Sequence, residues 1–468
     1  MRSITHPITV GFGLANLYLI AMTGPLISPD HDLVYHLIGA ASTIFIPIIA
    51  LVVVLWLALT ALLYFAERPS RLSVVIWSAL ILILPWVLLE TFADLFEVDV
   101  PEWLSRVLGF SVLFAVAAIA LFAKRLLPGF LRVRRVVAYV LGFMALSGCW
   151  IFAQLIWCGW QARDLNPPPA LHQAVAPHAP RQRIIWILLD ELSYKQVYEQ
   201  RFAGLELPAF DRLAAESTVF TRAVPTGEFT RYIVPSLITG VPANGVKVSA
   251  SGMLLSTFSH SAGSTSFDQR KTVFQDAIDA GYKTGLNGWY NPYCRILPAV
   301  LDKCFWTYHQ GIPGNLSPDH TVWKNLGIPL RLIRLSTRHF FDLGEGSPSE
   351  ELRDLQMHAT DYRDLRAAGD RMLRDPSINF LFVHMPIPHP YGFYDRRTKT
   401  FPTTRRSYID NLALADLYMA HVRELLESMG QWDSSIVVVM GDHSWRTDLI
   451  WKSSAGWTEE DEIGRAHV

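Results

Sequence analysis

The chain has 468 residues, of which 51% are hydrophobic and 18% charged, and its formal net charge is −1. This length is enough for two or more domains. A near-neutral charge lacks the basic excess of a nucleic-acid-binding protein, so we expect no nucleic-acid partner. The apolar residues are concentrated in the first third of the sequence, which is too hydrophobic for an ordinary soluble domain.

Five apolar runs in the first 160 residues predict an α-helical transmembrane bundle. Each offers about 20 largely apolar residues, enough to cross the hydrocarbon core of a bilayer. The first run lacks a clear small-residue cleavage site, so we interpret it as a signal anchor. Buried helices of a soluble protein are the alternative, which so many long uncharged runs disfavour. The predicted spans are 8–28, 34–65, 72–94, 103–123 and 136–160.

Charges between the spans predict their orientation, because basic loops stay in the cytoplasm. The second and fourth loops are basic and the first and third are acidic. We therefore expect a multi-pass protein of the inner or cytoplasmic membrane, with a cytoplasmic N-terminus and a periplasmic or extracellular domain after residue 160. Trp150, Trp157 and Trp160 would form an aromatic belt near the outer face. The basic residues are Arg68, Arg71, Lys124, Arg125, Arg132, Arg134 and Arg135, and the acidic ones are Asp30, Asp32, Glu97, Asp99 and Glu102.

The pattern changes after the last predicted span. Residues 161–183 are rich in Pro and Ala and predict an extended linker. From residue 184 onward, strands and helices alternate, which predicts an α/β domain over 184–461 with a mostly parallel sheet. The 312–349 stretch is poorly patterned and is interpreted as an insertion. We expect strands at 184–189, 282–287, 380–385 and 435–440, and helices at 207–217, 271–280, 350–374 and 406–429, with a loop entering a helix at 229–240.

Two of the predicted strands end on residues that bind metals. IIWILL is followed by Asp190 and Glu191, and SIVVVMG is followed by Asp442 and His443. In open α/β sheets ligands collect at the carboxyl ends of the strands, so these four residues form a candidate metal site. Carboxylates with an imidazole favour zinc, with manganese, magnesium or calcium as alternatives. A helix N-cap at Asp190 is the structural alternative. The second strand, which also ends on metal-binding residue types at Asp442 and His443, argues against this alternative.

Several motifs now form a recognisable series. LPAFDRLAAESTVFTRA (207–223), AGYKTG (280–285), HMPIPHP (384–390), YIDNLALAD (408–416) and GDHS (441–444) occur in this order. The series resembles the sulfatase-like branch of the alkaline phosphatase superfamily and covers residues 184–450. Five spans before such a domain resemble, in particular, bacterial phosphoethanolamine transferases and lipoteichoic acid synthases. The resemblance implies that Asp190 ligates the metal together with Asp442 and His443, with Glu191 as a further ligand or as support behind the site.

Thr230, in GEFTRYIVPSLITG, is the nucleophile and additional metal ligand that the resemblance implies. Sulfatases carry a Cys or Ser here within a C/S-x-P-x-R motif, and Thr cannot be converted to their formylglycine. Thr230 with Pro235 five residues later instead resembles the transferases, in which Thr attacks phosphorus. A metal would lower the pKa of the hydroxyl, and the helix N-terminus would hold a phosphoryl group. Capping of that helix is a compatible structural role, and Thr226 is a weaker competitor.

Two histidines complete the implied site. The resemblance gives His389 a role in binding substrate or protonating the leaving oxygen. His384, inside the preceding strand, would bind substrate or lie behind the metal. The LNGWYNPY segment (286–293) departs from the G-K-W-H pattern of sulfatases, in which the Lys and His contact sulfate. The missing cations count against sulfate ester hydrolysis.

The remaining signals concern cysteines and the C-terminus. Cys294 and Cys304 lie ten residues apart, and an oxidising compartment would permit a disulfide between them, although spacing alone leaves its geometry open. Cys149 and Cys158 are expected to be packing residues. The string EIGRAHV at 462–468 resembles a translated sequencing adapter, so we expect an incomplete catalytic domain; a genuine short polar tail is the alternative.

These inferences predict a membrane-anchored metalloenzyme. It would transfer a phosphoryl-type headgroup, such as phosphoethanolamine or phosphoglycerol, from a phospholipid donor in the bilayer to an envelope glycan or lipid. The alternatives are a sulfatase, a phosphodiesterase, a non-catalytic envelope-binding protein and a transporter.

Overall fold

The computed structural model describes residues 5–96, 102–165, 182–227, 229–259, 263–309, 322, 325, 350–390 and 392–444. The chain divides into two compact units. The first contains Met1–Val34, Gly39–Asp164 and Asn315–Ser347, and the second contains Tyr35–Ile38, Leu165–Gly314 and Pro348–Val468. Most of the predicted linker and insertion, and the whole 462–468 tail, lie outside the described residues.

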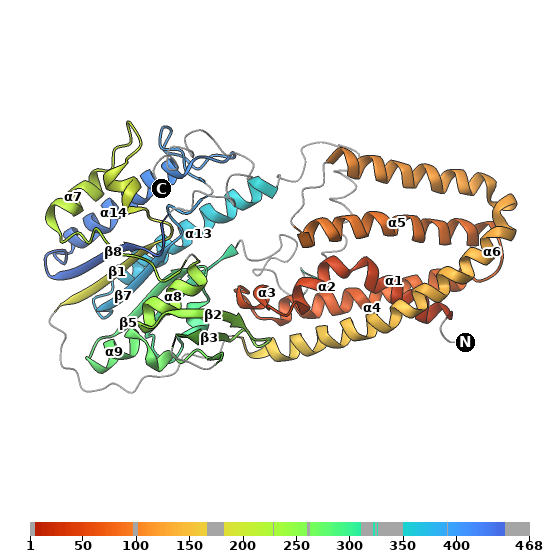
Figure 1. The fold of residues 1–468 in the computed structure, drawn as a ribbon, viewed down its shortest axis with the longest axis horizontal. Helices are drawn as coiled ribbons and strands as arrows, with labels where there is room; N and C mark the ends of the chain where they lie inside the picture. Colours follow the sequence, from red (N-terminus) through yellow and green to blue (C-terminus); the bar gives the residue numbers. More distant parts are fainter. Residues whose placement is uncertain are drawn as a thin grey trace. The chain divides into compact units, whose positions relative to one another are not determined.

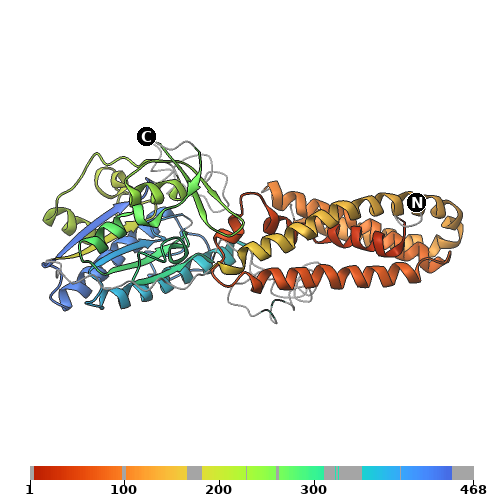
Figure 2. The same ribbon diagram turned by 90° about the horizontal axis from the view of Figure 1, so that it is seen from below.

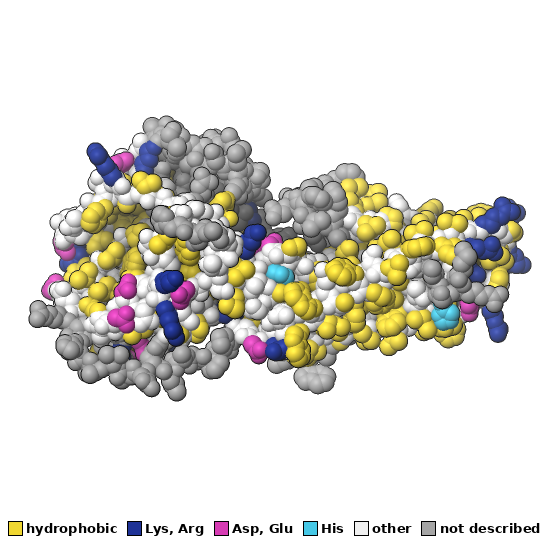
Figure 3. All heavy atoms as spheres, turned by 60° about the horizontal axis from the view of Figure 1, so that its bottom comes forward, with side chains coloured by type: hydrophobic (Ala, Val, Ile, Leu, Met, Phe, Trp, Pro, Cys, Tyr) yellow, Lys and Arg dark blue, Asp and Glu magenta, His cyan; other side chains and the backbone are white. Residues whose placement is uncertain are grey.

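The described part of the first unit is helical (Figures 1 and 2). Three of its helices are long and apolar enough to cross a membrane, and a fourth candidate is a pair bent by 72° between Tyr18 and Ile20. Figure 3 shows hydrophobic side chains over the surface of this unit. The helices are α1 (Pro7–Tyr18), α2 (Ile20–Ile27), α4 (Ser42–Phe65), α5 (Arg71–Phe96) and α6 (Glu102–Gln161), with the short α3 (Asp32–Tyr35) following α2.

The predicted fourth and fifth spans, residues 103–123 and 136–160, lie in one continuous helix and not in two helices separated by a loop. Helix α6 has 60 residues, which corresponds to about 90 Å at 1.5 Å per residue and exceeds one bilayer core of about 30 Å. Its ribbon changes direction partway along in Figure 1, and Pro128 lies inside it. An interior proline removes a helical hydrogen bond and bends the axis.

The basic centre of α6 lies against the turn between α4 and α5. The guanidinium of Arg134 donates to the backbone oxygens of Ala66, at 3.2 Å, and Glu67, at 3.1 Å. These oxygens belong to the C-terminal end of α4, where a cation is favourable. The two basic segments predicted to share one side of the membrane therefore meet, and Figure 3 shows Lys and Arg gathered at one end of this unit.

The predicted second span also starts later than expected, at Ser42 rather than residue 34. Tyr35–Ile38 instead belong to the second unit. Tyr35 is completely buried there against Val246, Val248 and Leu254. Burial of this ring in the core of the second unit explains why the segment does not extend α4.

A five-stranded sheet forms the centre of the second unit, in the order β6-β5-β7-β1-β8 (Figure 1). Every pairing in it is parallel, as the sequence predicted. Apolar residues alternate between its faces along β1, with Ile185 and Ile187 in one core and Leu188 in the other. The strands are β1 (Arg183–Leu189), β5 (Thr284–Trp289), β6 (Lys303–Thr307), β7 (Phe380–Met385) and β8 (Ser435–Gly441).

Helices cover both faces of this sheet, giving a three-layered α/β unit. One core contains residues of α7 (Pro208–Glu216), α13 (Glu350–Leu373) and α14 (Tyr408–Ser428). The opposite core contains residues of α8 (Thr230–Thr239), α9 (Val273–Asp279) and α10 (Tyr293–Ile296). Short helical turns occur at Ala162–Asp164, Lys195–Glu199 and Gln269–Lys271, and an antiparallel sheet is formed by β2 (Ala243–Val248), β3 (Leu254–Phe258) and β4 (Thr265–Ser266).

Candidate active site

The carboxyl ends of β1 and β8 bring the predicted acidic residues together. Leu189 and Gly441 are paired in the sheet, so Asp190 and Asp442 leave adjacent strands at the same level. Gly441 is required for this approach, because a Cβ at that position would lie 2.5 Å from the backbone oxygen of Leu192. The sheet register therefore places the two carboxylates side by side.

The backbone at Glu191 explains how two successive acidic residues reach one site. Glu191 has a φ of 61°, in the left-handed region that non-glycine residues seldom adopt. Its N–H donates to Asp442 Oδ1 at 2.9 Å, and the hydroxyl of Tyr408 donates to its backbone oxygen at 2.7 Å. This turn takes Asp190 and Glu191 out of strand alternation, and Asp190 does not cap a helix, since the next helical turn starts at Lys195.

The cluster combines three buried carboxylates with histidines. Asp190 and Glu191 are 0% exposed and Asp442 is 2% exposed. Donor atoms of Asp190, Glu191 and His443 lie within 4.8 Å of one another, as do those of a second set formed by Asp190, His384 and Asp442. Burying several carboxylates together is costly unless a cation compensates them.

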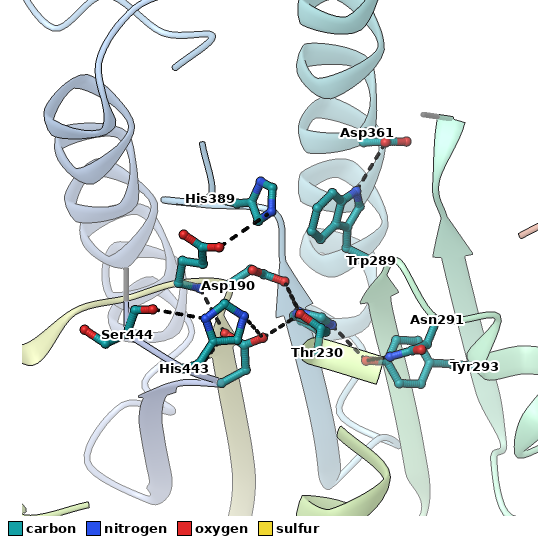
Figure 4. A network of polar contacts seen from close by, with 12 residues as sticks. Asp190, Thr230, Trp289, Asn291, Tyr293, Asp361, His389, His443 and Ser444 are labelled. Carbon is teal, nitrogen blue, oxygen red and sulfur yellow. Dashed lines mark hydrogen bonds and ion pairs between the residues drawn. The ribbon is translucent and has the colours of Figure 1, made fainter. Parts of the chain in front are cut away.

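His443 supplies a direct sign that these residues fit a cation. Its Nε2 atom is buried without a hydrogen-bond partner among the described residues, and it lies 3.3 Å from Asp442 Oδ2. A nitrogen lone pair beside carboxylate oxygens is a donor set that suits zinc or another transition metal. The four residues at the two strand ends therefore fit a divalent metal site (Figure 4).

Thr230 lies in this cluster at the first residue of α8. Its hydroxyl is 2.8 Å from Asp442 Oδ2 and 3.3 Å from Asp190 Oδ2. The N-cap position belongs to Phe229, so the Thr230 hydroxyl faces the carboxylates instead of capping the helix. Thr226, the competing candidate, is exposed.

The two predicted histidines approach the cluster from β7 and the segment after it. His389 Nε2 lies 3.9 Å from Glu191 Oε1, and the side chain remains 16% exposed. His384 is completely buried, and its Nε2 lies 3.2 Å from Asp190 Oδ2. Burial lowers the pKa of His384 to about 4, so its ring is neutral at pH 7. His384 thus lies behind Asp190, whereas His389 is the more accessible of the pair.

The structure contains a disulfide between Cys294 and Cys304, which joins α10 to β6. In the preceding segment, the indole N–H of Trp289 donates to the buried carboxylate of Asp361 at 3.2 Å (Figure 4).

Sequence reasoning missed Tyr293, Tyr408 and Asp361, because each contacts the site or its surroundings through a partner at least 70 residues away in the chain. Local sequence patterns carry no signal for such contacts.

Comparison with known proteins gives no family model and no curated protein that matches the chain. Three of the solved structures that it resembles are a phosphonate monoester hydrolase of Agrobacterium radiobacter, a sulfatase from Pseudoalteromonas sp., and murine ectonucleotide pyrophosphatase/phosphodiesterase 5 in an inactive form with AMP. Their identities are 14%, 14% and 12%, and their TM-scores are 0.34, 0.35 and 0.31.

Each match covers 56% of this chain and 63%, 55% and 57%, respectively, of the other. The chain therefore spans less than two thirds of the length of these structures. At this level of likeness we draw no functional conclusion from them, and the site is interpreted from its own geometry.

Proposed function

We propose that this protein is a membrane-anchored metalloenzyme of the sulfatase-like type that transfers a phosphoryl-containing headgroup through Thr230. One observation carries the proposal. The Thr230 hydroxyl, at the start of a helix, contacts two carboxylates of a buried cluster that fits a divalent cation. A hydroxyl nucleophile, a metal-type donor set and a helix N-terminus together suit attack on phosphorus.

Asp190, Glu191, Asp442 and His443 would hold the cation, with Thr230 as a further ligand. When bound, the cation would lower the pKa of the threonine hydroxyl and neutralise charge on the phosphoryl oxygens. Asp442 accepts the hydrogen bond of that hydroxyl at 2.8 Å and is positioned to take its proton. The N-terminus of α8 favours the negative charge of a phosphodiester.

The reaction would proceed in two displacements. Thr230 Oγ1 forms a bond to phosphorus while the bond to the leaving alcohol breaks, and protonated His389 donates a proton to that alcohol oxygen. The acceptor hydroxyl then attacks phosphorus and gives its proton to neutral His389, while the bond from phosphorus to Thr230 Oγ1 breaks and Thr230 takes back the proton held by Asp442. The partial exposure of His389 supports this exchange with substrates.

A phospholipid donor is proposed because of the first unit, whose long apolar helices are compatible with a bilayer. The acceptor would be an envelope glycan or lipid. The disulfide supports a catalytic unit outside the cytoplasm, since such bonds persist in oxidising compartments. Hydrolysis of a phosphodiester is the second candidate, and it differs only in that water replaces the acceptor hydroxyl.

The proposal is tested by intact-mass and peptide analysis of the full chain after incubation with vesicles of phosphatidylethanolamine and phosphatidylglycerol. We expect a phosphoryl-containing adduct on Thr230 that is absent from Thr230→Ala and present in Thr226→Ala. Release of headgroup without an acceptor would favour the phosphodiesterase. Hydrolysis of a sulfate ester without any adduct would overturn the transferase, and metal binding without either reaction would indicate a binding protein.

A further inference from the structure

A line of buried hydrogen bonds leads away from the candidate metal site, starting behind Asp190. His384 Nε2 lies 3.2 Å from Asp190 Oδ2, and His384 Nδ1 lies 2.8 Å from the hydroxyl of Tyr293. Asn291 Nδ2 lies 3.4 Å from the same hydroxyl, and the hydroxyl of Tyr35 donates to Asn291 Oδ1 at 2.9 Å. Part of this line is visible in Figure 4.

The chemistry of the groups assigns a direction to these bonds when Asp190 is ionised and His384 is neutral. An ionised carboxylate only accepts hydrogen bonds, so the Nε2 atom of His384 carries the hydrogen that points to Asp190. The Tyr293 oxygen accepts from Asn291, which leaves its own hydrogen for His384 Nδ1. Each donor in the line from Tyr35 to His384 therefore has a defined acceptor, and the line ends on Asp190.

The surroundings of Tyr293 are shaped to admit its ring. Gly288 pairs with His384 in the sheet, and a Cβ at Gly288 would lie 2.3 Å from the Tyr293 ring. Any residue larger than glycine at position 288 would displace the Tyr293 ring from His384. Tyr293 is 1% exposed and lies in the core beneath the sheet, with Leu286 and Phe382.

The far end of the line is also held in place. Arg295 donates to the backbone oxygens of Tyr35, at 2.8 Å, and Leu37, at 2.5 Å. The disulfide partner Cys294 lies between Tyr293 and Arg295 and ties this segment to β6. The segment Tyr35–Ile38 thus packs as a fixed part of the second unit, within which it belongs.

We propose that Tyr293 is a positioning residue for the metal site, and that Tyr35 and Asn291 complete its support. Through Tyr293, His384 presents an N–H to Asp190 and acts as an orienting donor rather than as a ligand of the cation. The alternative is that His384 binds the cation together with Asp190 and Asp442, with which it forms one of the candidate donor sets. This inference rests on the proposed function, because it assumes a cation held by Asp190.

The test measures zinc affinity of the full chain in detergent by competition with a chromophoric chelator, together with kcat, KM and thermal stability. Loss of a hydrogen bond behind a ligand typically weakens metal binding about 10- to 100-fold. We expect Tyr293→Phe to show a loss in this range with a lower kcat and little change in KM. Tyr35→Phe should show a smaller loss of zinc affinity.

Two further comparisons separate positioning from simple destabilisation. Tyr198→Phe is the matched control, since this hydroxyl donates to the backbone oxygen of Phe210 away from the cluster; it should leave zinc affinity unchanged. His384→Gln keeps an N–H that can reach Asp190, whereas His384→Leu does not. We expect His384→Gln to bind zinc much more tightly than His384→Leu, which also decides the question if Tyr293→Phe does not fold.

Three other results would contradict the positioning role of Tyr293 or the proposed function. Equal losses in His384→Gln and His384→Leu would make His384 a ligand and overturn the inference. Unchanged zinc affinity in Tyr293→Phe would overturn it as well. If the wild-type chain binds no divalent cation, the proposed function itself fails, which is a different outcome from a failure of the positioning role.

Discussion

At the scale of single residues, the candidate site carries an unfavourable concentration of negative charge. Asp442 illustrates how the fold tolerates it. Its Oδ1 accepts backbone N–H groups from Glu191 at 2.9 Å and from His443 at 2.8 Å, while Oδ2 faces Thr230. Asp442 Oδ1 therefore holds the backbone at the two strand ends in place, and Oδ2 faces the proposed nucleophile.

This division predicts an unusual response to Asp442→Asn. The amide keeps an oxygen for the two N–H groups and removes a charge from the buried cluster, so the metal-free variant should melt at a higher temperature than the metal-free wild type. At a cation concentration 100 times Kd, binding stabilises the wild type by about 2.7 kcal/mol. For a unit of this size that raises Tm by roughly 5–10 °C, and Asp442→Asn should lose this gain.

Thermal melts with and without zinc measure both effects. Asp416→Asn is the control, because Asp416 is also buried but accepts the Phe210 N–H at the start of α7, outside the cluster. It should retain the zinc-dependent gain. A metal-free Asp442→Asn variant that melts below the wild type would show that the cluster is not under charge repulsion.

At the scale of elements, the disulfide secures the segment that carries Tyr293. The bond closes a loop with a sequence separation of ten residues, for which chain entropy gives about 2.5 kcal/mol of stabilisation. Changing both cysteines to Ser should lower the Tm of the second unit by roughly 5–10 °C. Calorimetry with Cys149→Ser as the control checks this, since Cys149 forms no disulfide. An unchanged Tm would mean that the segment is held without the bond.

The comparison of predicted and observed elements shows which signals are local. Buried parallel strands were predictable because continuous apolar runs such as 380–385 have few alternatives, and β7 has these same bounds. The candidate metal residues at the ends of β1 and β8 were predictable because metal-binding residue types directly follow two predicted parallel strands, where ligands collect in such sheets. The contacts of Tyr293 were not, because the fold alone brings it to His384 from 91 residues away. The β2-β3-β4 sheet was also missed, since ANGVKV carries turn-type Asn and Gly inside a strand.

The apolar helices of the first unit show a different reason for error. A charged break was taken as a loop between residues 123 and 136, whereas α6 continues through it. Lys, Arg and Leu are good helix formers, so a polar interruption of a hydrophobic run need not interrupt the helix. Hydropathy locates what can enter a membrane, and backbone propensity decides where the helix ends.

At the scale of the whole molecule, the bent α6 makes a prediction about topology. If its two apolar parts cross the membrane separately, the ends of α6 lie on one side and its basic centre on the other. The contact of Arg134 with the α4–α5 turn supports this arrangement, because both basic segments then lie at the cytoplasmic surface. A single crossing would instead place Glu102 and Arg163 on opposite sides.

Cysteine labelling in intact cells with a membrane-impermeant maleimide distinguishes these arrangements. In a Cys149→Ser background we expect Glu102→Cys and Arg163→Cys to be labelled from outside, and Arg132→Cys and Arg68→Cys only after permeabilisation. Labelling of Arg132→Cys in intact cells would reject the double crossing. Outward labelling at Arg163, which lies just after α6, would agree with the proposed position of the Thr230 cluster in a compartment where Cys294 and Cys304 can remain oxidised.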